Sequence, residues 1–94
     1  MKKHNTKILL VDDEPDILEI VGYNLAQEGY QIVTASNGKE AILKAKKEMP
    51  DLIIMDVMMP EMDGMEACEN IRKIPELNNV IITFLTARSE DYSQ

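Results

Sequence analysis

Residues 51–56 read Asp-Leu-Ile-Ile-Met-Asp, and this stretch decides the fold because four consecutive apolar residues lead directly into a carboxylate, Asp56. A short, continuous apolar run is typical of a strand that is buried on both faces. Residues 7–13, Lys-Ile-Leu-Leu-Val-Asp-Asp, repeat the pattern and end in Asp12 and Asp13. Both runs predict central strands of a parallel sheet with acidic residues where each strand ends.

The segments around these two runs alternate between helical and extended patterns. Residues 16–28 and 63–73 carry apolar side chains at helical spacing, which places Met65 on the apolar face of the later helix. Another helix is predicted between Asn37 and Pro50, with Asn37 as its cap, Glu40 reaching back and Met49 on its apolar side.

Two further strands complete the pattern. Residues 31–35 form a less apolar strand, which we expect near an edge of the sheet, and residues 80–85 form a fourth strand. The alternation of strands and helices with short connections predicts a single α/β domain, a doubly wound parallel sheet with right-handed crossovers.

Composition narrows the class of protein. The chain has 94 residues and a net charge of -7, with 17 acidic and 10 basic residues, and no basic patch that would favour direct contact with nucleic acid. No apolar run approaches the roughly 20 residues of a membrane-spanning helix. Cys68 is the single cysteine, which fits a reducing cytoplasm, and we interpret it as a small apolar residue on a helix. We therefore expect a cytoplasmic protein.

Three predicted strands end in polar residues suited to one reaction: Asp12 and Asp13, then Asp56, then Thr86. The carboxyl ends of parallel strands meet at one edge of the sheet, where functional sites of such folds lie. Taken singly, each residue has an ordinary explanation, since Asp12 or Asp13 could cap the helix that begins near Pro15. Their joint occurrence favours a cluster of carboxylates without His or Cys, and such a cluster prefers a hard cation such as Mg²⁺.

Other acidic motifs fit less well. Phosphohydrolases of the haloacid dehalogenase type need a second Asp two positions after the nucleophile, and Met58 stands there. The alternating acidic residues of an EF-hand calcium loop are absent after Asp12, and no glycine-rich nucleotide-binding motif occurs.

Four stretches in order resemble the successive signatures of response regulator receiver domains. They are residues 7–14 (Lys-Ile-Leu-Leu-Val-Asp-Asp-Glu), 51–60 (Asp-Leu-Ile-Ile-Met-Asp-Val-Met-Met-Pro), 62–64 (Met-Asp-Gly) and 85–88 (Leu-Thr-Ala-Arg). The resemblance implies a flavodoxin-like receiver fold with strand order 2-1-3-4-5. It also implies a signalling phosphoacceptor that assists its own phosphotransfer and dephosphorylation, rather than an enzyme.

Individual roles follow from the same resemblance. Asp56 matches the phosphoacceptor, which takes a phosphoryl group from a sensor histidine kinase. Asp13, Asp56 and the backbone carbonyl of Met58 match the direct ligands of Mg²⁺, and Asp12 acts largely through water. Thr86 matches the hydroxyl residue that bonds the attached phosphoryl group and moves when the domain switches.

The resemblance also concerns what lies beyond this chain. Residues 58–60 and 86–88 are similar to those of regulators with winged-helix DNA-binding effectors, which implies an output in transcription. A receiver fold has five strands and five helices, so we expect residues 1–94 to form a C-terminally incomplete receiver domain. Strand 5, its Lys, helix 5 and most of helix 4 would be missing. We expect either self-association, by exchange or through the edge of the fourth strand, or an unstable monomer. The alternative function is a phosphorylation-independent interaction domain.

Overall fold

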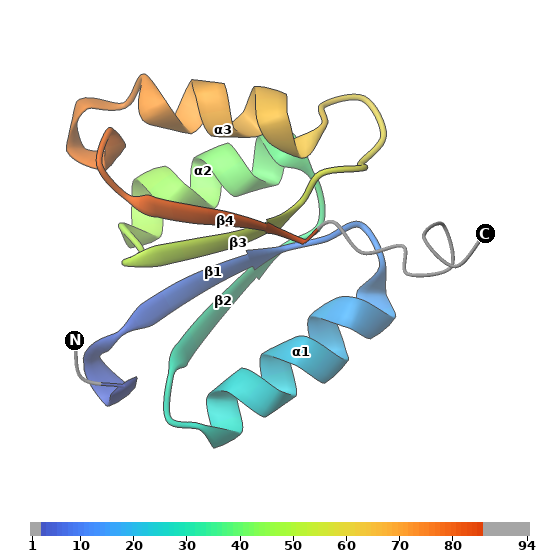
Figure 1. Cartoon of the computed structure of the whole chain (residues 1–94), viewed down its shortest axis with the longest axis vertical. Helices are drawn as coiled ribbons and strands as arrows, with labels where there is room; N and C mark the ends of the chain where they lie inside the picture. The colour runs from blue at the N-terminus through green and yellow to red at the C-terminus, as the bar shows by residue number, and fades with distance from the viewer. Residues whose placement is uncertain (1–2, 86–94) are drawn as a thin grey trace.

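The computed structural model describes residues 3–85, which form a four-stranded parallel sheet with the order β2-β1-β3-β4. The strands are β1 (Lys7–Val11), β2 (Gln31–Ala35), β3 (Leu52–Asp56) and β4 (Ile81–Leu85). The helices are α1 (Pro15–Gln27), α2 (Gly38–Glu48) and α3 (Gly64–Arg72), with short 3-10 turns at Lys3–Asn5 and Pro75–Leu77. Helix α1 lies on one face of the sheet and α2 and α3 on the other (Figure 1). The predicted doubly wound α/β fold is confirmed, with the first four strands of the expected order.

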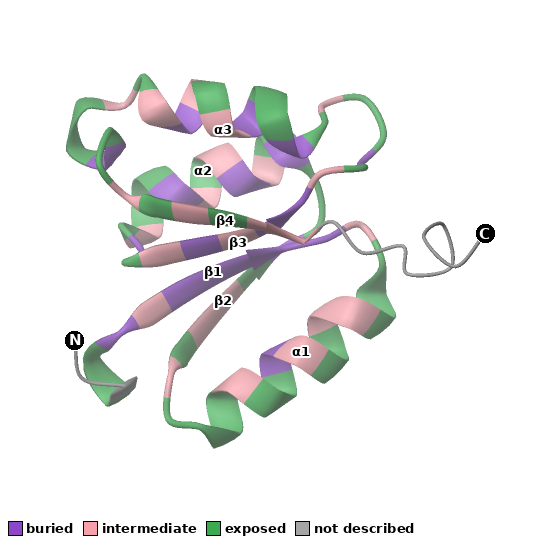
Figure 2. Cartoon of the chain, in the orientation of Figure 1, coloured by how far each residue is buried: buried purple, intermediate pink, exposed green. Residues whose placement is uncertain are grey.

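The sheet is most deeply buried in its two central strands. β1 pairs with both β2 and β3, and β3 pairs with β4, so Leu9 faces Val33 on one side and Ile53 on the other. Leu9 and Ile53 are fully buried, whereas β2 is only partly covered, as expected for an edge strand (Figure 2). The two apolar runs at residues 8–11 and 52–55 therefore form the centre of the fold.

The larger core lies between the sheet and the helices α2 and α3. Alanines at the inner face of these helices let the backbone approach the strands closely. The buried members of this core are Leu9, Val11, Ala35, Ala41, Ala45, Ile53, Met55, Met59, Ala67, Ile71 and Leu77. On the opposite face, Gly22 of α1 is buried, and a side-chain carbon at that position would meet Ile32 and Leu10 at ordinary contact distances of 3.7 and 3.8 Å.

The start of α2 follows the sequence prediction with one difference. The Asn37 side chain accepts a hydrogen bond of 2.8 Å from the Glu40 amide, which caps α2. Glu40 does reach back, but it accepts hydrogen bonds from the amide and hydroxyl of Ser36, one residue before the cap. These bonds lower the pKa of Glu40. Gly29, with a φ of 104°, takes a left-handed conformation just after α1, as glycine commonly does beyond the end of a helix.

Two methionines lie outside the apolar faces predicted for them. Met49 is 44% exposed and takes a left-handed φ of 48° as the C-terminal cap of α2. Met65 is 55% exposed, because the buried face of α3 instead runs through Ala67 and Ile71. The size of an apolar side chain misled the prediction in α3, where a small alanine is the residue that packs against the sheet.

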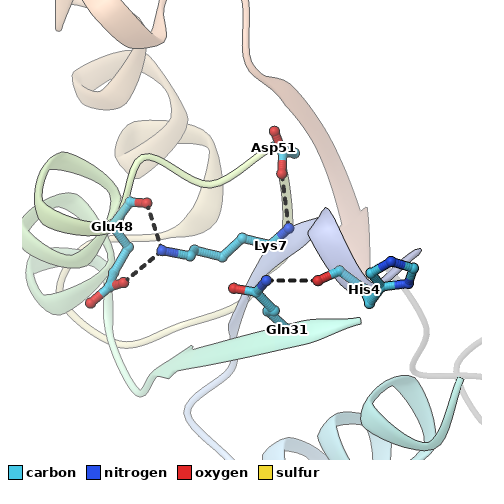
Figure 3. Close-up of polar contacts among 5 residues, drawn as sticks. All are labelled: His4, Lys7, Gln31, Glu48 and Asp51. Atoms are coloured by element: carbon cyan, nitrogen blue, oxygen red, sulfur yellow. Dashed lines mark hydrogen bonds and ion pairs between the residues drawn. The ribbon is translucent and has the colours of Figure 1, made fainter. Parts of the chain in front are cut away.

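A polar cluster at the amino ends of the strands joins β1, β2, α2, the 3-10 turn at Lys3–Asn5 and the residue before β3 (Figure 3). Lys7 Nζ lies 3.1 Å from Glu48 Oε1 and donates to the Glu48 carbonyl at the end of α2. The Lys7 amide donates to Asp51 at 2.8 Å, and the Gln31 side chain donates to the His4 carbonyl. At this end of the sheet the Lys7 ammonium is thus paired with Glu48 of α2, and the Lys7 amide is bonded to Asp51, just before β3.

Within the part of the chain that the structure describes, no helix has the length and apolar character needed to cross a membrane.

Candidate functional site

The three acidic residues predicted to meet at the carboxyl edge of the sheet do so. Asp12 and Asp13 follow β1, and Asp56 ends the neighbouring strand β3. Each of the three offers one carboxylate oxygen, and these oxygens all lie within 4.8 Å of one another. Parallel pairing of β1 with β3 produces this arrangement, because it aligns two strands that both run straight from apolar residues into carboxylates.

Burial makes this cluster costly to ionise. Asp12 is 4% exposed and Asp56 is 6% exposed, and Asp13 is partly buried. Loss of hydration raises the pKa of Asp12, and the negative charges of Asp56 and Asp13 raise it further, against a hydrogen bond from the Glu14 amide that lowers it. The neighbouring charges that act on Asp12 are all carboxylates. A bound cation would remove this penalty.

Backbone amides fix two of the carboxylates. Asp12 Oδ1 accepts from the Glu14 amide at 2.9 Å, and Asp56 Oδ1 accepts from the Met58 amide at 3.1 Å. Neither Asp12 nor Asp13 caps α1, since the residue at the cap is Glu14 and its side chain makes no capping bond. Asp13 Oδ1 is buried and has no hydrogen-bond partner among residues 3–85. A buried acceptor of this kind is suited to a ligand that the cluster would share.

The first residue of α3, Gly64, packs against the backbone of Asp56 and Val57. The Gly64 amide donates to the Val57 carbonyl at 2.9 Å, and a side-chain carbon at Gly64 would lie 2.3 Å from the Asp56 carbonyl oxygen. Only glycine fits so close to the backbone. The Asp63 side chain caps the helix by accepting from the Glu66 amide at 2.9 Å. The end of β3 is thereby held against the first turn of α3.

Of the remaining predicted site residues, one lies within the described part of the chain and one lies outside it. Met58 lies next to the cluster, with its amide bonded to Asp56 and its side chain 64% exposed. Thr86 lies outside the described residues, and β4 ends just before it at Leu85, which pairs in register with Asp56. The sequence pattern did not reveal the packing of Met62 on Gly38, because Met62 lies in the loop after β3, Gly38 begins α2, and no periodicity relates them.

The donor set fits a divalent cation of the hard type. Three carboxylates supply oxygen ligands alone, and such sets suit Mg²⁺ better than softer transition metals. Within residues 3–85, the Asp13 oxygen without a hydrogen-bond partner and the raised pKa of Asp12 both indicate that a cation would stabilise the cluster. The arrangement combines a fixed carboxylate at Asp56 with a place for a cation beside it, which is suited to chemistry on phosphoryl groups.

Comparisons with known proteins agree with this geometry. The model of the family described as "Response regulator receiver domain" matches residues 8–94. The alkaline phosphatase synthesis transcriptional regulatory protein PhoP of Bacillus subtilis is 44% identical over 90 residues, which cover 96% of this chain and 37% of the relative. The chain therefore spans little more than a third of the length of that relative.

Solved structures show the same likeness. The Vibrio cholerae chemotaxis protein CheY4 matches with a TM-score of 0.82 and 34% identity, covering 93% of this chain and 75% of the other. The receiver domain of a sensor histidine kinase from Pseudomonas aeruginosa matches with a TM-score of 0.84 and 32% identity, covering 89% and 69%. That structure is described with a magnesium ion coordinated in its active-site cleft.

Proposed function

Because the chain belongs to the response regulator receiver domain family, we propose that it is the phosphoacceptor module of a two-component system in which Asp56 accepts a phosphoryl group from a sensor histidine kinase. The observation that carries this proposal is the cluster of Asp12, Asp13 and Asp56, whose carboxylate oxygens lie within 4.8 Å at the carboxyl edge of the sheet.

The reaction assigned to Asp56 is a transfer between two protein side chains. The Asp56 carboxylate attacks the phosphorus of a phosphohistidine, the phosphorus–nitrogen bond breaks, and an acyl phosphate forms on Asp56. The Met58 amide, which donates to Asp56 Oδ1 at 3.1 Å, holds the carboxylate in one orientation for this attack. The close packing of Gly64 against the Asp56 backbone limits its movement. Positioning of this kind supplies much of the rate in phosphoryl transfer.

The metal roles are assigned to residues beside the phosphoacceptor. Asp13, Asp56 and the Met58 carbonyl would hold Mg²⁺ directly, and Asp12 would act largely through water. Asp13 Oδ1, which is buried and has no hydrogen-bond partner within residues 3–85, supports this assignment, as does the burial-raised pKa of Asp12. When bound, Mg²⁺ neutralises charge between the incoming phosphoryl group and the carboxylates.

The output step extends the proposal beyond the described residues. The Thr86 hydroxyl would bond the attached phosphoryl group and shift the domain between two states, and hydrolysis of the acyl phosphate would reset it. The domain is thus a signalling module that assists its own phosphorylation and dephosphorylation. Since the Bacillus subtilis relative is a transcriptional regulator and is far longer than this chain, the proposed output is a DNA-binding effector domain that acts in the cytoplasm.

The test is phosphorylation by a small phosphodonor. The chain is incubated with acetyl phosphate and Mg²⁺, and its mass is compared with that of Asp56→Asn and of Asp51→Asn, a matched Asp at the other end of β3. A phosphoryl adduct on the wild type and Asp51→Asn, lost in Asp56→Asn and on chelation of Mg²⁺, supports the proposal. The absence of any adduct favours the phosphorylation-independent interaction domain. Turnover of added phosphoesters without an adduct favours a phosphohydrolase.

Self-association through β4 stays a prediction. Among residues 3–85, β4 pairs with β3 alone, and Ile81 on this edge strand is 55% exposed. An edge strand offers its backbone groups to another chain. Light scattering at several concentrations checks this prediction, and a monomer at every concentration would contradict it.

A further inference from the structure

A contact between Met62 and Gly38 ties the loop after β3 to the first residue of α2. A side-chain carbon at Gly38 would lie 2.8 Å from Met62 Sδ and 2.9 Å from both Met62 Cβ and Cγ, so Met62 rests directly on the Gly38 backbone. Two of these three atoms are close to the Met62 main chain. A larger residue at position 38 would therefore displace the loop itself and not only the flexible tip of Met62.

The loop that Met62 closes contains a strained turn. The Met62 amide donates to the Pro60 carbonyl at 2.8 Å, and Glu61 between them has a φ of 68°. A three-residue turn with positive φ at a residue other than glycine is rare and unfavourable. It persists only where the surrounding contacts hold it. Met59, which is 7% exposed in the core, lies immediately before the turn, and Met62 packs on Gly38 at its end.

The same contact joins the two sides of the acidic cluster. The loop begins at Asp56, whose carboxylate accepts from the Met58 amide. Gly38 begins α2 shortly after β2, and the last residue of β2, Ala35, accepts a hydrogen bond of 3.1 Å from the Asp12 amide. The Met62–Gly38 contact thus links the loop that carries Met58 to the segment bonded to Asp12, independently of the pairing between β1 and β3.

We infer that Met62 and Gly38 are positioning residues for the metal site. Their contact maintains the strained turn at Glu61 and so holds Met58 and the end of β3 in place relative to Asp12. Loss of the contact would relax the turn and widen the distribution of ligand positions, which weakens the binding of a small cation with strict geometric demands. The part of this inference that concerns Mg²⁺ rests on the proposed function, and the part that concerns the loop does not.

The test is a titration of the chain with magnesium chloride, followed by the NMR signals of the Met58 and Gly64 amides. Met62→Ala and Gly38→Ala should each weaken Mg²⁺ affinity by about tenfold, the lower end of losses for residues that support metal ligands. Met62→Leu keeps the side-chain volume and should retain most of the affinity. Two matched controls should leave it unchanged: Met65→Ala, at an exposed methionine, and Gly22→Ala, where a side-chain carbon fits at ordinary contact distances.

Amide hydrogen exchange without Mg²⁺ provides the second readout. The Met58 and Gly64 amides should exchange faster in Met62→Ala and Gly38→Ala than in the wild type and the two controls. If the wild type binds Mg²⁺ and these variants bind it equally, with unchanged exchange and only a lower Tm, the contact is ordinary packing and the inference is wrong. If the wild type binds no Mg²⁺, the proposed metal site fails, and the exchange rates still decide whether the contact holds the loop.

Discussion

The two ends of the sheet differ in how their charged side chains are arranged. At the amino ends of the strands, the Lys7 ammonium lies 3.1 Å from a Glu48 carboxylate oxygen and also bonds the last turn of α2. At the carboxyl ends, three carboxylates meet within 4.8 Å, and burial together with their mutual repulsion raises the pKa of Asp12. The first arrangement stabilises the fold, and the second costs stability unless a ligand compensates it.

Strand β3 shows the contrast within six residues. Asp51, just before the strand, is exposed and accepts a hydrogen bond of 2.8 Å from the Lys7 amide. Asp56, at the end of the strand, is only 6% exposed and shares its site with two other carboxylates. The same residue type thus serves as a link between strands at one end and as the proposed phosphoacceptor at the other, because its surroundings differ.

The largest expected effect is a loss of Mg²⁺ affinity at the carboxyl end of the sheet. Asp13→Asn removes one anionic ligand and should weaken Mg²⁺ affinity by about 100-fold or more, since even supporting residues of metal sites cost 10- to 100-fold. A titration with magnesium chloride, followed by NMR, measures this loss. Asp51→Asn is the matched change at the amino end and should leave the affinity within error of the wild type. Equal losses in both variants would contradict the contrast between the two ends.

An effect of intermediate size is expected on the free energy of unfolding in the absence of Mg²⁺. Asp12→Asn removes a buried charge while the amide oxygen still accepts from the Glu14 amide, so it should raise the free energy of unfolding at neutral pH by about 1 kcal/mol. Because the pKa of Asp12 is raised in the folded state, its protonated form stabilises the protein below the ordinary value of 3.8, and this contribution is lost as the pH rises.

Thermal unfolding at several pH values checks both parts of this prediction. The advantage of Asp12→Asn should be present at neutral pH and disappear below about pH 3.8. An advantage that grows on acidification, or a loss of stability at neutral pH in the absence of Mg²⁺, would show that the cluster does not strain the folded state.

The smallest expected effect is a change in Tm at the amino end of the sheet. Lys7→Met removes a partly exposed ion pair and should lower the Tm only slightly. The Lys7 hydrogen bond lowers the pKa of Glu48, so its stabilising contribution is present above the ordinary value of 4.5 and is lost as the pH falls. The difference in Tm between wild type and Lys7→Met should therefore shrink in acid. The wild type is the more stable protein of this pair, whereas the variant is the more stable protein in the comparison with Asp12→Asn. Circular dichroism melts measure it, and a weakened Mg²⁺ affinity in this variant would contradict the separation of the two ends.

The sequence identified the central strands and the acidic cluster because both depend on local pattern and chain direction. Two apolar runs that end in carboxylates can be read from consecutive residues, and parallel pairing then brings Asp12, Asp13 and Asp56 to one edge. Helix faces were predicted less well. Met65 was assigned to the apolar face of α3, but Ala67 packs there, because the close approach of helix and sheet favours a small residue that a hydrophobicity pattern underweights.

By itself, the sequence determined the α/β order of elements, the likeness to receiver domains and the residues on which the proposed chemistry depends. These follow from periodicity and from motifs that are contiguous along the chain. Only the tertiary structure decided which groups contact one another. Lys7 pairs with Glu48, Met62 packs on Gly38, and Asp13 Oδ1 is buried without a hydrogen-bond partner among residues 3–85. The two contacts join residues that lie far apart in the chain, and they arise only when packing brings α2 against β1 and against the loop after β3.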